Sequence, residues 1–306
     1  MSKGLTASAI LQAQSLNYDE GIANISVLKK LTRGDGTLLT FVSRQALRYD
    51  IVRLGHDMYD WNLQVVKKKN KTPVQFRDDM SIKDSVEMDL FGYMKTSKKG
   101  DSDAGGANTR PAVVRLSNAI SLEPYRSDTE FLTDKGLADR IGVNPDIANI
   151  EQHLSFYTYT FTIDLDKVGV DGNIQLDNKE RAERVNQFLD IVKVLNRNIR
   201  GRQENLSPVF IIGGIYDLPS PFFLGKIGLN AKNGAYYIQE DKLNSALEMT
   251  VCGTKICDNT YAGIAGGYFA NDFRIKEMLG ERVISVENFI KNMRDKVNEY
   301  YGVSGI

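Results

Sequence analysis

The stretch 24–55 contains the residues of this chain whose chemistry is easiest to interpret, because a basic loop leads into a helix that begins with arginines. The cationic and polar side chains that we select there are Lys29, Lys30, Arg33, Ser43, Arg44, Gln45 and Arg48. The start of a helix already carries about half a positive charge, so Arg44 and Arg48 are unfavourable there unless an anion lies nearby. Gly34 and Gly36 let a ligand approach the loop backbone closely. We therefore predict that this stretch binds the phosphates of a nucleic acid.

The same stretch also allows a purely structural interpretation. Thr40 or Ser43 would cap the helix, and the arginines would lie in solvent or pair with Asp50 or another acid. The residues alone leave both interpretations open.

Few residues of the chain suggest catalysis. The sequence has no G-x-S-x-G or H-E-x-x-H pattern, and its two histidines, His56 and His153, are far apart. The acid best placed for chemistry is Asp35, beside the predicted phosphate path. We interpret it as a turn former between two glycines, and we keep a metal-dependent ribonuclease that uses Asp35 as the alternative function.

No cofactor or metal site is predicted. Cys252 and Cys257 form a single C-x4-C pair, and only the two histidines could complete a zinc site with them. Two reduced, partly buried thiols are the simpler interpretation. The glycine-rich segments IIGG and AGIAGGYFA do not have the spacing of a phosphate-binding or dinucleotide-binding loop.

The composition is that of an ordinary globular protein. The 306 residues are 42% hydrophobic and 25% charged, which is enough for a sizeable core. Lys+Arg 39 and Asp+Glu 39 balance to a formal net charge of zero, so any affinity for nucleic acid must come from local patches. The N-terminal segment MSKGLTASAILQAQSLN resembles neither a signal peptide nor a membrane span, and we expect a cytoplasmic protein.

Hydrophobic periodicity predicts an α+β fold. Alternation predicts strands over 5–14 and 155–166, and helical spacing predicts helices over 41–57 and 178–201. A short apolar run within 207–218 predicts a further strand that ends in a tight loop at Gly213 and Gly214. The order strand, helix, strand, helix, strand fits a ferredoxin-like or RRM-like core. A further helix is expected from Ser285, with its apolar side packed on the core.

The chain between the first helix and the strand at 155–166 is far longer than a compact domain needs for a connection, so an insertion is predicted there. Its centre, TSKKGDSDAGGANTR at 96–110, is poor in apolar residues and is expected to be mobile without a partner.

Four separated motifs carry a resemblance to a known family. The segments TFVSRQALRYDIVR, DLFGYM, RPAVVRLSNAISLEPY and SPVFIIGG occur in the right order within 5–224. Together they resemble the DevR subfamily of CRISPR-associated RNA-binding autoregulators, which are RAMP-superfamily backbone subunits of type I-B Cascade.

The resemblance implies a right-hand-shaped, non-catalytic subunit that polymerises along CRISPR guide RNA and presents it to target DNA. The palm would be one RRM-like domain spanning 1–306, with finger and thumb elements inserted at about 60–152 and a C-terminal extension at about 219–306. The expected partners are guide RNA, target DNA through that RNA, further copies of the chain and the other Cascade subunits, and no membrane.

The resemblance also implies roles for single residues. It places Ser43, Arg44 and Gln45 on the guide-RNA backbone, and Arg33, Arg110 and Arg115 are added on charge and expected location. The family's autoregulator name implies a third function, binding to the chain's own transcript or promoter, for which the residues themselves give no sign.

Overall fold

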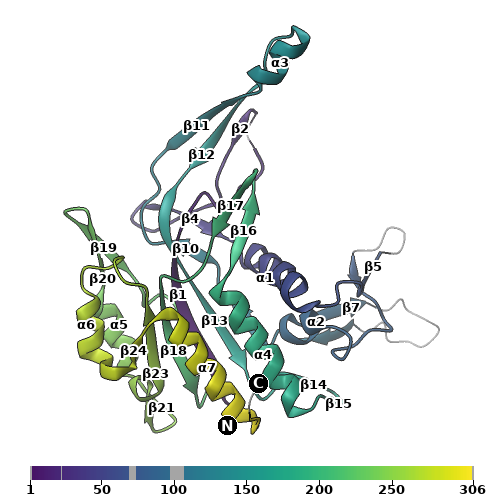
Figure 1. Ribbon diagram of the computed structural model, residues 1–306, viewed down its shortest axis with the longest axis vertical. Helices are drawn as coiled ribbons and strands as arrows, with labels where there is room; N and C mark the ends of the chain where they lie inside the picture. The colour runs from purple at the N-terminus through teal and green to yellow at the C-terminus, as the bar shows by residue number, and fades with distance from the viewer. Residues whose placement is uncertain (1, 22, 69–73, 97–106, 305–306) are drawn as a thin grey trace.

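The computed structural model describes residues 2–21, 23–68, 74–96 and 107–304. Its central feature is a 9-stranded sheet, in which the strands lie in the order β24-β23-β18-β1-β13-β10-β4-β3 and β9 also pairs with β13 (Figure 1). These strands are β1 (Gly4–Gln14), β3 (Lys30–Thr32), β4 (Leu38–Val42), β9 (Val114–Leu116), β10 (Ala119–Ser121), β13 (Leu154–Asp164), β18 (Phe210–Tyr216), β23 (Thr260–Ile264) and β24 (Val283–Ile284).

The centre of the sheet is the antiparallel pair of β1 and β13, and its two faces differ as their alternation predicts. Side chains such as Leu5, Leu11 and Phe161 are buried in the larger apolar core on one face. The other face carries hydroxyl groups that pair across the strands, and Ser8 Oγ lies 2.5 Å from Thr160 Oγ1. The predicted strands at 5–14 and 155–166 are therefore confirmed.

Seven α-helices lie among the described residues and cover both faces of the sheet. They are α1 (Arg44–Tyr59), α2 (Val86–Phe91), α3 (Lys135–Ile141), α4 (Asn178–Lys193), α5 (Glu240–Leu247), α6 (Asp272–Leu279) and α7 (Val286–Tyr301), with short 3-10 helices η1 (Ile256–Asn259) and η2 (Gly280–Arg282). Side chains of α1, α4 and α7 fill the larger core, and those of α5 and α6 fill a second core on the opposite face. None of these helices is long and apolar enough to cross a membrane.

The predicted α+β fold is confirmed. In chain order β1, α1, β10, β13, α4 and β18 give strand, helix, strand, strand, helix, strand, and the four strands lie side by side in the sheet. This is the element order of a ferredoxin-like unit. The helix expected from Ser285 is α7, and Ser285 is its N-cap residue. The RRM-like interpretation of the core stays a prediction.

Two predicted element boundaries are wrong. Helix α4 ends at Lys193, well before Gly201, because Arg200 and Gly201 form the two-residue turn of the hairpin β16–β17 with φ of 47° and 76°. Gly213 lies inside β18 rather than in a loop after it. A Cβ atom on Gly213 would lie 2.1 Å from the carbonyl oxygen of Thr6, so the neighbouring strand leaves no room for a side chain.

The remaining strands form small sheets around this core. A three-stranded sheet contains β2 (Ile25–Ser26), β11 (Asp128–Thr133) and β12 (Ile147–Gln152). The two-stranded sheets are β5 (Val66–Lys67) with β6 (Gln75–Phe76), β7 (Tyr93–Thr96) with β8 (Ala107–Arg110), β14 (Val170–Asp171) with β15 (Ile174–Gln175), β16 (Asn196–Ile199) with β17 (Arg202–Asn205), β19 (Leu229–Lys232) with β20 (Ala235–Ile238), and β21 (Thr250–Val251) with β22 (Thr254–Lys255).

The region expected as an insertion, 60–152, has two projecting parts. One part, with α2 and the hairpins β5–β6 and β7–β8, lies beside α1, and the other is an arm of β11 and β12 with α3 at its tip (Figure 1). Between them, β9 and β10 belong to the central sheet, so the region is not wholly outside the core. Residues 97–106, the centre of the segment expected to be mobile, lie outside the described residues.

Candidate nucleic-acid interface

Helix α1 begins with an N-terminal cap. Ser43 is the N-cap residue, and its Oγ accepts the backbone N–H of Ala46 at 3.2 Å. The N–H of Leu47 donates to the Ser43 carbonyl oxygen at 3.1 Å, and that of Arg44 donates to Asn118 Oδ1 at 2.9 Å. Ser43 therefore caps the helix, as the purely structural interpretation expects. Because the N–H groups of Arg44, Ala46 and Leu47 already have acceptors, an anion here would be held mainly by side chains.

The start of α1 lies against a cleft of about 390 Å³, which we call the arginine cleft. It is lined by Arg44, Gln45, Arg48, Phe91, Ala112, Val114, Arg115 and Leu116. Arg44 and Arg115 are exposed, and neither side chain forms a hydrogen bond or an ion pair with any described residue. The fold thus brings together two free guanidinium groups that are distant in sequence.

The third arginine of the cleft is partly neutralised. Arg48 Nη2 pairs with Glu87 Oε1 at 2.7 Å, and its guanidinium group lies 5.2 Å from the centre of the Phe91 ring. The acid considered from the sequence, Asp50, instead pairs with Arg197 at 2.6 Å in the interior. Burial raises the pKa of the Asp50 carboxyl group, although Arg197 opposes this. The Arg48 side chain is one-third exposed and remains at the cleft surface.

The lysines of the basic loop are engaged elsewhere. Lys30 Nζ pairs with Glu151 Oε2 at 2.6 Å and lies 4.6 Å from the centre of the Tyr125 ring. This pair connects β3 to β12 at the base of the arm. Lys29 Nζ is 3.4 Å from Asp19 Oδ1 in a more exposed pair. Arg33 is exposed at the turn between β3 and β4, and its side chain has no ion pair with a described residue. Of these three residues only Arg33 has no ion pair with a described residue.

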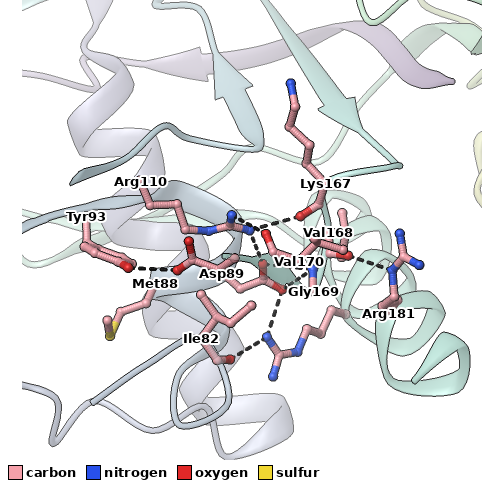
Figure 2. Close-up of polar contacts among 12 residues, drawn as sticks. Ile82, Met88, Asp89, Tyr93, Arg110, Lys167, Val168, Gly169, Val170 and Arg181 are labelled. Carbon is pink, nitrogen blue, oxygen red and sulfur yellow. Dashed lines mark hydrogen bonds and ion pairs between the residues drawn. The ribbon is translucent and has the colours of Figure 1, made fainter. Parts of the chain in front are cut away.

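Arg110 requires a correction, because its guanidinium group is buried within the protein rather than facing a ligand. Its side chain is only 6% exposed and pairs with Asp89 at 2.5 Å (Figure 2). It also donates to the carbonyl oxygens of Val170 and Lys167 at 2.6 and 3.0 Å. A cation held by these partners is not accessible to RNA, so we remove Arg110 from the interface.

Asp89 is the centre of the cluster that holds this side of the cleft in place. Its fully buried carboxylate accepts hydrogen bonds from Arg110, from Arg184 at 2.8 Å and from the N–H of Gly169 at 3.0 Å. Charge-assisted bonds of this kind are stronger than neutral ones. The same short helix, α2, carries Glu87 and Phe91, both of which contact the Arg48 side chain. The cluster therefore positions α2 against α4 and α1.

Sequence reasoning missed the roles of Glu87, Phe91 and Asn118. Phe91 lies in the motif DLFGYM, and Asn118 lies in the motif RPAVVRLSNAISLEPY. Both motifs indicated the family. Their sequences alone do not indicate that these two residues lie near the start of α1. Glu87 lies just before the motif DLFGYM, and nothing in the sequence around it indicates a contact with Arg48.

Asp35 has the structural role that the sequence suggests. The N–H of Thr37 donates to its Oδ1 at 3.0 Å, and Gly36 has φ of 83°. This hydrogen bond lowers the pKa of the Asp35 carboxyl group. The carboxylate is therefore engaged by the turn itself.

The cysteine pair does not form a metal site with its neighbours. In the described parts of the chain no cluster of three or more His, Cys, Asp or Glu side chains could hold a metal ion. Cys252 and Cys257 are both free thiols, and Cys252 is exposed rather than partly buried as expected. His153 is buried between β12 and β13, where its Nδ1 lies 2.7 Å from Thr40 Oγ1.

Comparison with known proteins identifies the family. The profile described as "CRISPR-associated negative auto-regulator DevR/Csa2" matches residues 5–237, which is most of the chain. The chain belongs to the DevR/Csa2 family. This confirms the resemblance that the four motifs carry.

A curated relative matches part of this DevR/Csa2 chain. "CRISPR-associated protein Cas7/Cst2/DevR" of Myxococcus xanthus (strain DK1622) is 28% identical over 147 residues, which are 44% of this chain and 48% of that protein. The chain thus spans about half the length of the curated relative.

Two solved chains share the fold of this DevR/Csa2 member. One, titled "CRISPR RNA-guided surveillance complex, pre-nicking", has a TM-score of 0.56 and 12% identity, and the match covers 96% of this chain and 100% of that chain. The other, titled "CRISPR RNA-guided surveillance complex", has a TM-score of 0.51 and 13% identity, with 94% and 99% covered. At such low identity the likeness concerns the fold alone.

Proposed function

We propose that the chain is a non-catalytic, guide-RNA-binding backbone subunit of a type I-B Cascade complex. Copies of it would polymerise along the CRISPR guide RNA and present that RNA for pairing with target DNA. The family assignment and the titles of the two solved structures support a subunit of an RNA-guided complex.

The arginine cleft is the observation that carries this proposal. Arg44 and Arg115 line it without any carboxylate partner among the described residues, and Arg48 adds a partly neutralised charge beside them. Free guanidinium groups bind phosphate in a bidentate manner. A chain with zero net charge gains electrostatic affinity for RNA only at such a local cluster.

The chemistry of the cleft suits an RNA of any sequence. Its polar side chains are three arginines and Gln45, and its other walls are apolar. Contacts to phosphates set the position of a nucleic acid without reading its bases. A subunit that must accept every guide requires this kind of contact. We include Ser43 as a positioning residue, because its cap sets where Arg44 and Gln45 lie.

The same proposal includes a role for the arm in assembly. The tip of the arm exposes Leu137, Ile141 and Val143, with exposed fractions of 60%, 75% and 53%. Apolar side chains grouped on a projecting segment are typical of a surface that another molecule covers. We infer that the arm is the thumb and meets the next copy or the RNA between copies. A head-to-tail contact that does not close produces the open filament that an RNA track needs.

The palm in this proposal is the RRM-like unit formed by β1, α1, β10, β13, α4 and β18. The C-terminal extension from about 219 packs beside it through the second apolar core. The assembled complex would be cytoplasmic, and its other members would be the remaining Cascade subunits.

RNA retained during purification tests the proposal. The double variant Arg44→Glu/Arg115→Glu should lose co-purifying RNA, measured as the ratio of absorbance in the nucleic-acid and protein bands. The control Lys276→Glu/Lys291→Glu makes the same change of charge at exposed positions of α6 and α7, outside the cleft. Circular dichroism checks that both variants are folded. Equal RNA content in the two double variants would contradict the assignment of the cleft.

Absence of catalysis is tested separately on the assembled complex. We expect no regularly spaced cuts in complementary RNA with magnesium present, and the same result for Asp35→Ala. Cuts that disappear in Asp35→Ala would instead favour the ribonuclease. The hydrogen bond from the Thr37 N–H to the Asp35 carboxylate supports a role in the turn and therefore the non-catalytic proposal.

A further inference from the structure

A second depression lies on the face of the central sheet that carries the hydroxyl groups of β13, and we call it the sheet groove. It has a volume of about 370 Å³ and extends between the β3–β4 turn, the strands β10 and β13, and the segment 224–242. The lining residues that matter here are Arg33, Asn118, Ile120, Thr158, Gly228 and Lys242. Arg33 is an expected RNA contact and Asn118 accepts the Arg44 N–H, whereas the other four have no place in the function proposed above.

The groove holds several polar groups that have no partner in the described parts of the chain. Arg33 and Lys242 are exposed and lack an ion pair, and they come from different elements. The Asn118 side chain uses its oxygen for the Arg44 N–H and leaves its amide hydrogens free. The half-buried Thr158 hydroxyl group also makes no hydrogen bond. Most of these groups are donors, which favours an anionic ligand.

Lys242 is directed toward the groove wall at Gly228. A Cβ atom on Gly228 would lie 3.2 Å from Lys242 Nζ and 2.5 Å from Gln239 Oε1. The missing side chain therefore makes room for the ammonium group at this wall. Lys242 lies beyond the part of the chain that the family profile matches, which ends at residue 237.

The single carboxylate among the described lining residues does not cancel these charges. This acid is Asp35, whose carboxyl pKa is lowered by the hydrogen bond from the Thr37 N–H at 3.0 Å and by the nearby charge of Arg33, so it offsets part of the positive charge. Two unpaired cations against one acid leave the groove with a positive balance. Leu39, Ile120 and Leu122 give the groove an apolar part that suits the flat face of a base, beside polar lining residues such as Ser121 and Thr160.

The sheet groove and the arginine cleft meet at one residue. Asn118 lines the groove, and its Oδ1 accepts the backbone N–H of Arg44, the first residue of α1, at 2.9 Å. Arg44 in turn lines the arginine cleft. A single hydrogen bond therefore joins the walls of the two depressions.

We propose that the sheet groove binds one further nucleotide of the RNA held in the arginine cleft, and that Lys242 is a phosphate contact. The phosphate lies between Arg33 and Lys242, and the base covers the apolar wall near Ile120. This inference rests on the proposed function and adds to it an RNA contact from the C-terminal extension.

Binding of a fluorescent single-stranded RNA to the full chain tests the inference. Lys242→Gln should weaken binding and should reduce the slope of log affinity against log salt by about 0.7, the value for one phosphate contact on a single strand. Arg33→Gln should act in the same direction. The matched control is Lys276→Gln, an exposed lysine of α6 that lines neither depression.

The outcomes separate the two proposals. If Arg44→Glu/Arg115→Glu abolishes binding while Lys242→Gln and Arg33→Gln keep the wild-type affinity and slope, the sheet groove is overturned and the cleft stands. If the folded wild-type chain binds no RNA, the proposed function itself fails.

Discussion

Asp89 and Arg184 form an ion pair of 2.8 Å deep in the protein, with side-chain exposures of 0% and 4%. The pair connects α2, from the region expected as an insertion, to α4, whose side chains pack in the larger core. Arg110 completes the cluster from β8 (Figure 2). Since α2 also supplies Glu87 and Phe91 to the surroundings of Arg48, this buried contact determines the shape of the arginine cleft.

Removing the Asp89 carboxylate should strongly destabilise the fold. Asp89→Ala leaves two buried guanidinium groups without their common partner, and breaking such a pair costs about 3–5 kcal/mol of unfolding free energy. Urea denaturation followed by circular dichroism measures the change. The matched control is Asp139→Ala, whose exposed pair with Lys135 spans 3.0 Å and is worth about 0.3–0.5 kcal/mol. Similar losses in both variants would show that the cluster is not a structural anchor.

Removing the carboxylate that neutralises Arg48 should strengthen RNA binding. Glu87→Gln keeps the size of the side chain but frees the guanidinium group that now pairs with Glu87 at 2.7 Å. One more phosphate contact would steepen the salt dependence of RNA affinity by about 0.7 in slope. Fluorescence anisotropy over a salt series measures it. Glu299→Gln on α7 removes an exposed carboxylate elsewhere and should leave the slope unchanged.

Substitution of Ser43 separates its capping role from any contact with RNA. Ser43→Ala removes the acceptor for the Ala46 N–H and should lower the unfolding free energy by about 1 kcal/mol. Ser43→Thr keeps a hydroxyl acceptor and should restore most of this loss. Thermal unfolding of both variants gives the stability, and RNA affinity is measured beside it. An unchanged stability in Ser43→Ala would mean that the cap contributes little to α1.

Acidification should weaken the junction between the arm and the sheet through His153. This ring is 7% exposed, its Nδ1 lies 2.7 Å from Thr40 Oγ1, and burial lowers its pKa below the ordinary 6.5. A lowered folded-state pKa means that the unfolded chain binds the proton more readily, so the contribution is complete above about pH 6.5 and decreases as the pH falls.

Comparison with a variant isolates that contribution. His153→Gln cannot take up a proton, so its unfolding free energy should decrease less than that of the wild type between neutral and mildly acidic pH. Urea denaturation at a series of pH values measures both curves. Parallel curves would exclude His153 as the cause, because the other titrating groups are common to the two proteins.

The sequence by itself determined the strands and helices that have a periodic hydrophobic pattern, and it determined the family. Alternation in 5–14 and 155–166 and the helical stripe after Ser43 are local patterns, because a strand or helix repeats its exposure every two or about 3.6 residues. The four motifs led to the DevR/Csa2 family through the same linear information. These features do not depend on how distant segments meet.

Only the tertiary structure decided which cations remain free to bind a ligand. Lys30 and Arg110 look equivalent to Arg44 and Arg115 in the sequence, but the fold places Glu151 beside Lys30 and Asp89 beside Arg110. The interaction between charges depends on their separation in space and on their burial, and neither follows from spacing along the chain. The fold likewise brings Lys242 to the groove that Arg33 lines, although the two residues are distant in sequence.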